Sequence, residues 1–196
     1  MNLAVPEVNE VTGLVHFLRR WQSREEKVYG AVPLRRSEYG NINYEGTPES
    51  FDSAIFTRWH ASFAESLEPG IRKLVLALVQ AWDCLTYSSC EGHRGVGGTA
   101  WRPRHVRMAS RSSTEDQRIG AELDRLVAAT NAQDLGPPGP IVVKRRGTVV
   151  GDEGLEMPGW DLIFESGSGD ESNYWAGLDL RYRACLRAVD APDGAP

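Results

Sequence analysis

The chain has 196 residues, 41% hydrophobic and 25% charged, which is typical of a globular protein that buries a core without disulfide or metal support. Its formal net charge of −5 argues against a general nucleic-acid-binding protein, because phosphate binding usually requires a basic excess. Three cysteines are too few for a disulfide scaffold, and neither a signal peptide nor an apolar run of roughly 20 residues is recognisable. We therefore expect a cytoplasmic protein with reduced thiols and no membrane partner.

Three helices are expected in the first half of the chain. Apolar residues recur at intervals of three and four over Val8–Trp21 and again over Ile71–Trp82, as in amphipathic helices. Another helix is expected after Pro48, where four apolar residues stand four apart: Phe51, Ile55, Trp59 and Phe63. The segment 27–47 is interrupted by glycines and rich in tyrosine and arginine, so it is either a lid over a site or a surface loop.

Two strands are expected directly after the third helix. Leu85–Cys90 and His105–Ala109 are both β-prone, and a glycine-rich loop separates them. Because side chains alternate along a strand, we expect Thr86, Ser88 and Cys90 to share one face of the first strand.

The rest of the chain predicts a helix, a hairpin and a last helix. Ser113 is expected to cap the helix. Ile141–Arg146 and Trp160–Glu165 read as antiparallel strands joined by a turn-rich segment. In the last helix, Trp175–Val189, Cys185 lies on the apolar face and is expected to be a small buried hydrophobe.

Helices and strands are segregated along the chain. This order predicts an α+β fold with a small, mainly antiparallel sheet of about four strands and about five helices. We expect a single domain over residues 1–190, followed by a frayed tail at 191–196.

Cys90, Glu91 and His93 are the first candidates for catalysis. A cysteine nucleophile needs a base or a positive field to form its thiolate, and His93 lies three residues further on. Glu91 could orient the imidazole or act as a separate acid-base group. The simpler alternative is that Cys90 is a buried thiol at a strand end and that His93 is an exposed loop residue.

The same residues also suggest a metal site. Cys90 and His93 have the spacing of half a zinc site, and His105 is the next candidate ligand. Either Cys84 or His60 could complete four ligands. A catalytic metal with three protein ligands and a water is a further alternative.

Arginines are concentrated next to this motif in an otherwise acidic chain. Guanidinium groups beside glycine-rich backbone suit the binding of a carboxylate or a phosphate. The alternative is that they are solvated and pair with the excess acids. Arg107 is expected on the same face of its strand as His105. The candidate substrate-binding residues are Ser88, Ser89, Arg94, Arg102, Arg104, His105 and Arg107.

The run Ser88-Ser89-Cys90-Glu91-Gly92-His93 resembles the Ser-Ser-Cys-Ser-Gly-Arg signature of the wybutosine-synthesis methyltransferase family. In that family, which modifies a tricyclic guanosine of tRNA, the motif also follows a helix and begins a strand. Here Glu91 replaces Ser and His93 replaces Arg. The resemblance implies a small α+β enzyme that transfers a methyl group from S-adenosylmethionine. The Ser-Cys-Glu-Gly-His core is also similar to that of uncharacterised bacterial and phage proteins.

The leading hypothesis is a small cytoplasmic enzyme that acts on an anionic small molecule or a nucleotide-like substrate. Cys90, Glu91 and His93 would carry the chemistry, and the neighbouring arginines would hold the anion. The alternative is a non-catalytic protein that binds a metal ion such as zinc, or a partner, through the Cys90–His93 loop.

Overall fold

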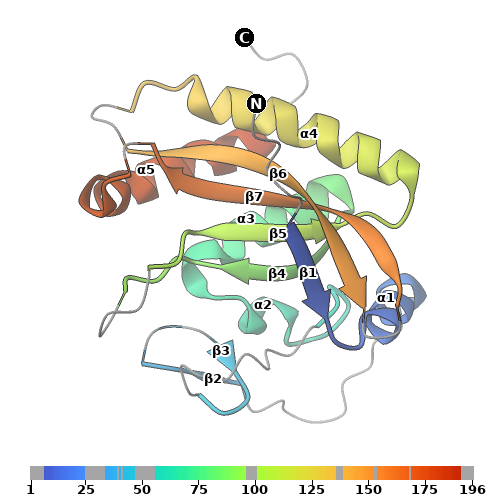
Figure 1. Ribbon diagram of the computed structural model, residues 1–196. Coiled ribbons are helices and arrows are strands. Elements are labelled where there is room, and N and C mark those ends of the chain that lie inside the picture. Colours follow the sequence, from blue (N-terminus) through green and yellow to red (C-terminus); the bar gives the residue numbers. More distant parts are fainter. Residues whose placement is uncertain are drawn as a thin grey trace.

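The computed structural model describes most of the chain (Figure 1). The described residues are 7–24, 34–38, 40, 42–46, 56–95, 101–135, 139–151, 154–167 and 169–190. Within them, the helices are α1 (Leu14–Ser23), α2 (Phe63–Ser66), α3 (Pro69–Trp82), α4 (Ser113–Asn131) and α5 (Glu171–Asp190). The strands are β1 (Glu7–Val11), β2 (Arg35–Arg36), β3 (Ile42–Asn43), β4 (Leu85–Cys90), β5 (His105–Ala109), β6 (Pro140–Gly151) and β7 (Glu156–Ser166).

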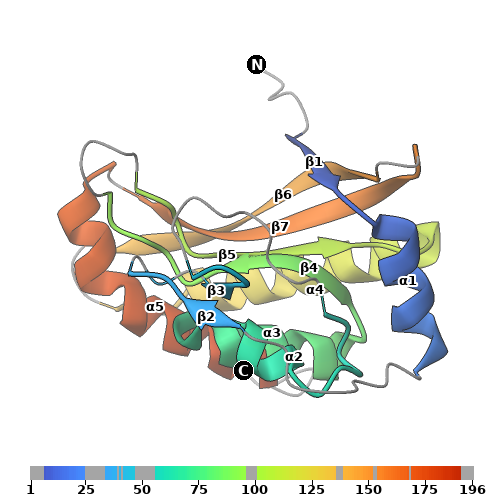
Figure 2. The ribbon, with the colours of Figure 1, turned by 90° about the horizontal axis from the view of Figure 1, so that it is seen from below.

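Five strands form one sheet in the order β1-β6-β7-β5-β4, and β2 pairs with β3 in a separate hairpin. β1 runs parallel to β6, whereas all other neighbours in the main sheet are antiparallel. Helices α3, α4 and α5 lie on one face of this sheet (Figure 2). The predicted α+β class is therefore confirmed. The predicted mainly antiparallel sheet of about four strands is wrong, because the sheet is mixed and has a fifth strand.

The hydrophobic core fills the space between the sheet and these three helices. Its fully buried side chains include Leu74 and Leu78 of α3, Ile119 of α4, and Met108 and Phe164 of the sheet. Burial of each side chain of this size contributes about 1.5–3 kcal/mol. No helix in the described residues is long and apolar enough to cross a membrane.

The additional strand of the sheet is β1, which occupies the segment that was expected to begin the first helix. Residues Glu7–Val11 pair in register with residues 147–151 of β6. Val8 is 60% exposed while Asn9 and Val11 are buried, which is the alternation of a strand. Gly13, with a φ of +70°, then turns the chain into α1. The prediction failed because a spacing of three between Val8 and Val11 is that of a helix, whereas in the strand the two side chains point to opposite faces.

The helix expected after Pro48 is also corrected. Among the described residues of this stretch, 58–62 form turns and bends, and the helix covers only Phe63–Ser66. The indole nitrogen of Trp59 donates to the carbonyl oxygen of Trp21 at 2.7 Å, so this side chain bridges two segments. Residues 47–55, the start of the 27–47 loop and the expected tail at 191–196 lie outside the described residues.

The remaining elements follow the predictions with small shifts. α3, β4, β5 and α5 are where the sequence predicts them. The cap of α4 is Ser112 instead of Ser113, because the Ser112 hydroxyl oxygen accepts from the Glu115 amide at 3.2 Å. β6 and β7 extend into the segment expected to be turns, since Thr148 pairs with Pro158.

A β-bulge in β4 changes which of its side chains share a face. Thr86 pairs with Met108, whereas Ser88 pairs with Arg107 on the next position of β5. Cross-strand partners point to the same face, so Thr86 lies on the face opposite Ser88 and its predicted position is wrong. Ser88 and Cys90 share one face, as predicted, because their partners Arg107 and His105 do. On β5, His105 and Arg107 are half-exposed and alternate with buried residues, as predicted.

Gly177 lies in the middle of α5, where the helix packs closely against the start of β6. A substitution at this position therefore tests the packing of α5 against the sheet. A Cβ at this position would lie 2.9 Å from the Cα of Gly139 and 2.9 Å from the Cδ of Pro140. Gly177→Ala is therefore expected to destabilise the protein by about 1–3 kcal/mol, although alanine normally stabilises a helix interior. Chemical denaturation measures this change.

Gly120→Ala in α4 is the matched control. Its Cβ would approach the Trp160 side chain at 3.0 Å instead of backbone, so we expect a smaller loss because the ring can shift. A Gly177→Ala variant that is as stable as the wild type would contradict the described packing.

Candidate functional site

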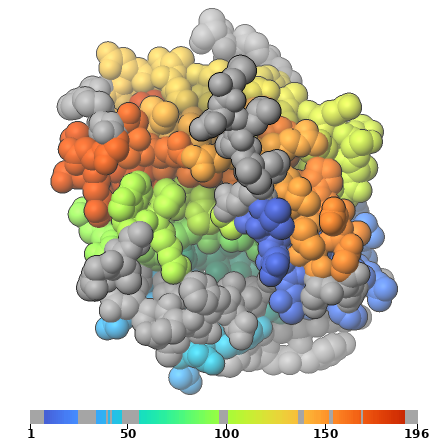
Figure 3. All heavy atoms as spheres, viewed as in Figure 1, coloured from blue at the N-terminus to red at the C-terminus, as the bar shows by residue number. Residues whose placement is uncertain are grey.

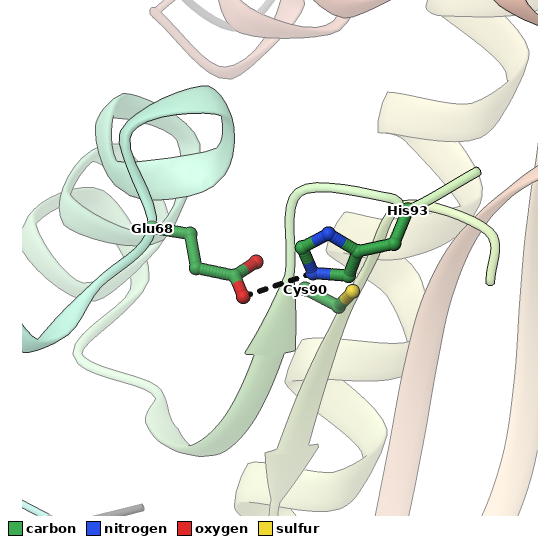
Figure 4. Close-up of side chains that lie close together, drawn as sticks. All are labelled: Glu68, Cys90 and His93. Atoms are coloured by element: carbon green, nitrogen blue, oxygen red, sulfur yellow. Dashed lines mark hydrogen bonds and ion pairs between the residues drawn. The ribbon is translucent and has the colours of Figure 1, made fainter. Parts of the chain in front are cut away.

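Three side chains with different donor atoms meet where α3 begins and β4 ends (Figure 4). Glu68 is the N-cap residue of α3, Cys90 is the last residue of β4, and His93 lies in the following loop. A carboxylate oxygen, the thiol sulfur and a ring nitrogen all lie within 4.8 Å of one another. Glu68 and Cys90 are buried and His93 is half-buried, so together they could hold a metal ion.

Hydrogen bonds fix the orientation of these side chains. Glu68 Oε1 lies 3.0 Å from His93 Nε2, and Glu68 Oε2 accepts from the Glu91 amide at 2.6 Å. The sulfur of Cys90 accepts from the Gly92 amide at 3.4 Å. Backbone N–H groups thus hold both the carboxylate of Glu68 and the sulfur of Cys90.

Glu91, at the end of β4, also binds α3, but here the carboxylate belongs to the β4 side and the amide to the helix. Its Oε2 accepts from the Gly70 amide at 2.6 Å, where the first amides of a helix have no partner within the helix. The Glu68 carboxylate therefore binds the Glu91 amide, while the Glu91 carboxylate binds the start of α3. This exchange fastens the end of β4 to the start of α3.

The loop after Cys90 has a defined shape. His93 and Arg102 exchange two backbone hydrogen bonds of 3.0 and 2.8 Å. Gly92 has a φ of +89°, and a Cβ there would lie 3.3 Å from both the Arg104 amide nitrogen and the Trp175 ring. A side chain at position 92 would therefore be strained, which explains why the motif contains glycine here.

The β2–β3 hairpin contacts the same site. Arg36 Nη2 binds Glu91 Oε1 at 2.5 Å. A Cβ on Gly40 would lie 3.1 Å from His93 Cε1 and 3.2 Å from Glu91 Oε1. The described part of the 27–47 loop therefore packs over the cluster, and whether it opens as a lid stays a hypothesis.

The three cysteines differ in their surroundings. Burial raises the pKa of Cys84 and of Cys185 to about 12, so both remain thiols at neutral pH. Cys185 is fully buried, as predicted. Hydrogen bonds with the side chains of Cys90 and then Glu68 raise the pKa of His93 to about 10. Only Cys90 therefore has an imidazole and a carboxylate beside it.

No family model matches the chain, and no curated protein or solved structure matches it either. The resemblance of the motif around Cys90 to the wybutosine-synthesis methyltransferases stays a prediction.

The predicted arginines do not converge on one pocket. Arg104 is 6% exposed, and its Nε donates to the Glu91 carbonyl at 2.8 Å. Arg94 lies over the ring of Trp175, with the guanidinium carbon 5.0 Å from the ring centroid. Arg107 pairs with the buried Asp161 on the sheet, away from the α3 face. Arg102 shapes the loop through the backbone bonds described above.

The other predicted ligands also lie apart from the cluster. Ser88 faces Arg107 across the strands, and Ser89 faces Val106. His105 pairs with Cys90 in the sheet register, but its Nδ1 lies 3.1 Å from the Pro103 carbonyl and it is not a member of the cluster. Cys84 belongs to the core, and His60 stacks on Phe56 with ring centroids 3.8 Å apart.

Glu68 was not predicted. It is a glutamate directly before the Pro69-Gly70 start of α3, a position usually occupied by an exposed capping residue. Its side chain forms no cap hydrogen bond with its own helix and instead points to the end of β4. Only the contact between α3 and β4 reveals this role.

Proposed function

We propose that Glu68, Cys90 and His93 bind a zinc ion in an enzyme that acts on an anionic substrate. The proximity of one sulfur, one nitrogen and one oxygen donor carries this proposal. Ligand atoms around a tetrahedral zinc ion, with bonds of about 2.0–2.3 Å, are roughly 3.5 Å apart. In the cluster, Glu68 Oε1 and His93 Nε2 are 3.0 Å apart, and no two of the three donor atoms are more than 4.8 Å apart. Three protein ligands leave the fourth position for water or substrate, as in catalytic zinc sites.

The surroundings of the cluster support metal binding. Zinc ligands are usually oriented by hydrogen bonds from outside the coordination sphere. The Glu91 amide holds the second oxygen of Glu68, and the Gly92 amide donates to the sulfur of Cys90. These contacts would keep the donors in place before the ion arrives.

The charges around the site favour an anionic substrate. With a neutral His93, the Glu68 and Glu91 carboxylates and the Cys90 thiolate would face the zinc ion and the guanidinium groups of Arg36 and Arg104. Asp179, 3.8 Å from Arg104, balances the remaining positive charge. The case for an anion therefore rests on the zinc ion itself, whose fourth position would bind a phosphate, a carboxylate or a hydroxide.

A second candidate is an enzyme without metal in which Cys90 is the nucleophile. The amide of Gly92 and the imidazole of His93, both beside the sulfur, favour this candidate because each stabilises a thiolate. Methyl transfer from S-adenosylmethionine is a subclass that only the motif resemblance implies. An anionic substrate suits both candidates.

Metal content of the protein, purified without an affinity tag, separates the two candidates. We expect one zinc ion per chain in the wild type. Glu68→Gln, Cys90→Ala and His93→Ala are each expected to weaken zinc binding by at least about tenfold, because each removes a ligand. Elemental analysis after dialysis against a range of buffered zinc concentrations measures this loss.

His105→Ala is the matched control, since His105 lies next to Cys90 in the sheet but outside the cluster. We expect it to keep its zinc. A wild type that takes up no zinc, and whose Cys90 is alkylated by iodoacetamide in the native state, would refute the zinc site and support the thiol enzyme.

A further inference from the structure

The β2–β3 hairpin lies over the proposed zinc ligands. Figure 1 shows it below the end of β4, and its light-blue atoms lie at the surface of the molecule in Figure 3. A Cβ on Gly40 would lie 3.1 Å from His93 Cε1, the ring carbon next to the nitrogen that would bind zinc. A molecule that approaches His93 from this side therefore meets the hairpin first.

The hairpin is a separate structural unit. In the part of the chain that the structure describes, β2 and β3 pair with each other and with no strand of the main sheet. The Gly40 amide donates to the Ser37 carbonyl at 3.0 Å, and the Gly46 amide donates to Asn43 Oδ1 at 2.5 Å. Because these hydrogen bonds lie within the hairpin, it can move as a unit without breaking them.

An ion pair between Arg36 and Glu91 attaches the hairpin to the site. Arg36 Nη2 binds Glu91 Oε1 at 2.5 Å, and the Arg36 side chain is 48% exposed. An ion pair with this much exposure contributes little to stability and weakens as salt is added. If Arg36 moves away, water hydrates its guanidinium, and Glu91 keeps its bond to the Gly70 amide. Separation of the pair therefore leaves neither group without a hydrogen-bond partner.

The proposed zinc ligands are held independently of the hairpin. Glu68, Cys90 and His93 belong to the start of α3, the end of β4 and the loop that follows. The two hydrogen bonds between the end of β4 and the start of α3 involve no hairpin residue. Movement of the hairpin would therefore uncover the zinc ligands without separating them.

We propose that the β2–β3 hairpin is a movable lid over the zinc ligands and that the Arg36–Glu91 ion pair is its latch. The closed lid excludes water and other molecules from the ligands, and movement of the lid admits the metal ion and the anionic substrate. The role toward zinc and substrate rests on the proposed function. The movement itself can be measured without zinc, because Cys90 under the lid is only 8% exposed.

Alkylation of Cys90 by iodoacetamide in the zinc-free full chain tests the lid. Cys84 and Cys185 are fully buried, and mass spectrometry identifies the cysteine that reacts. Arg36→Gln is expected to accelerate the reaction of Cys90 at least about fivefold, because the lid opens more often. Loss of the positive charge alone would slow the reaction, since it disfavours the thiolate. Added salt should accelerate the reaction in the wild type and have little effect in Arg36→Gln.

Arg35→Gln is the matched control, because it removes the same charge from the neighbouring position of β2, where the side chain lies close to Gly46. We expect it to react at the wild-type rate. Gly40→Ala weakens the closed position by another route, since its Cβ would press against His93 and its φ of +98° disfavours alanine. It should accelerate alkylation at least as much as Arg36→Gln.

Release of zinc to a chelator measures the lid in the loaded protein, and Arg36→Gln should accelerate this release by a similar factor. Equal alkylation rates in the wild type, Arg36→Gln and Gly40→Ala would overturn the lid, whether or not the protein binds zinc. A wild type that takes up no zinc, together with faster alkylation of Cys90 in both variants, would overturn the zinc site and support the lid.

Discussion

Removal of zinc by a chelator is expected to lower the melting temperature of the wild-type protein by roughly 8–16 °C. A ligand that binds only the native state at a free concentration of a thousand times its Kd stabilises that state by about 4 kcal/mol. For a chain of this length, each kcal/mol shifts the melting temperature by about 2–4 °C. Glu68, Cys90 and His93 come from a helix start, a strand end and a loop, so zinc would hold all three segments together.

Calorimetry with a saturating chelator, compared with a small excess of zinc, measures this shift. Cys90→Ala should show no difference between the two conditions, whereas His105→Ala should behave like the wild type. Equal melting temperatures of the wild type with zinc and with chelator would contradict zinc binding at this site, because binding to the native state must stabilise it.

Arg104→Ala is expected to reduce the free energy of unfolding by about 3 kcal/mol, through lost contacts within the protein. The guanidinium donates to the Glu91 carbonyl and lies over the ring of Tyr182, 4.6 Å from its centroid. Truncation would leave that carbonyl without its charged donor and open a cavity beside Gly70. The sequence suggested a substrate-binding role for Arg104, while its burial assigns it to the support of the site.

Urea denaturation of the zinc-free protein measures this change independently of the metal. Arg94→Ala is the matched control, because Arg94 is exposed and lies over the face of Trp175, and we expect a loss below about 1 kcal/mol. If Arg104→Ala were as stable as Arg94→Ala, the described role of Arg104 in supporting Glu91 would be wrong.

The helices and strands that were predicted correctly are those whose pattern of apolar or β-prone residues can be recognised within the segment itself. The apolar stripe of α3 and the β-prone run of β4 are examples. β4 has both predicted ends, whereas α3 ends at Trp82 as predicted but begins two residues earlier, at Pro69. β1 was missed because the spacing between Val8 and Val11 is that of a helix, and only its pairing with β6, far along the chain, selects the strand. Trp59 was placed on a helix because its contact with Trp21 cannot be read from spacing.

The candidate site was predicted in the same partial way. Cys90 and His93 are close in sequence, so the loop between them indicated a pair of donors. Glu68 lies 25 residues before His93 and joins them only because α3 and β4 form a reversal of the chain. His105, the predicted ligand, is the strand partner of Cys90 but is not in the cluster, and its Nδ1 lies 3.1 Å from the Pro103 carbonyl instead.

The exchange between Glu68 and Glu91 has a consequence for how the site opens. Glu91 donates its amide to the Glu68 carboxylate and accepts the Gly70 amide with its own carboxylate, so both bonds join the end of β4 to the first residues of α3. Moving Glu91 away from α3 would therefore break both bonds together. Unfastening the helix from the strand and dispersing the zinc ligands would therefore be one event, and the site should be either fully assembled or fully open.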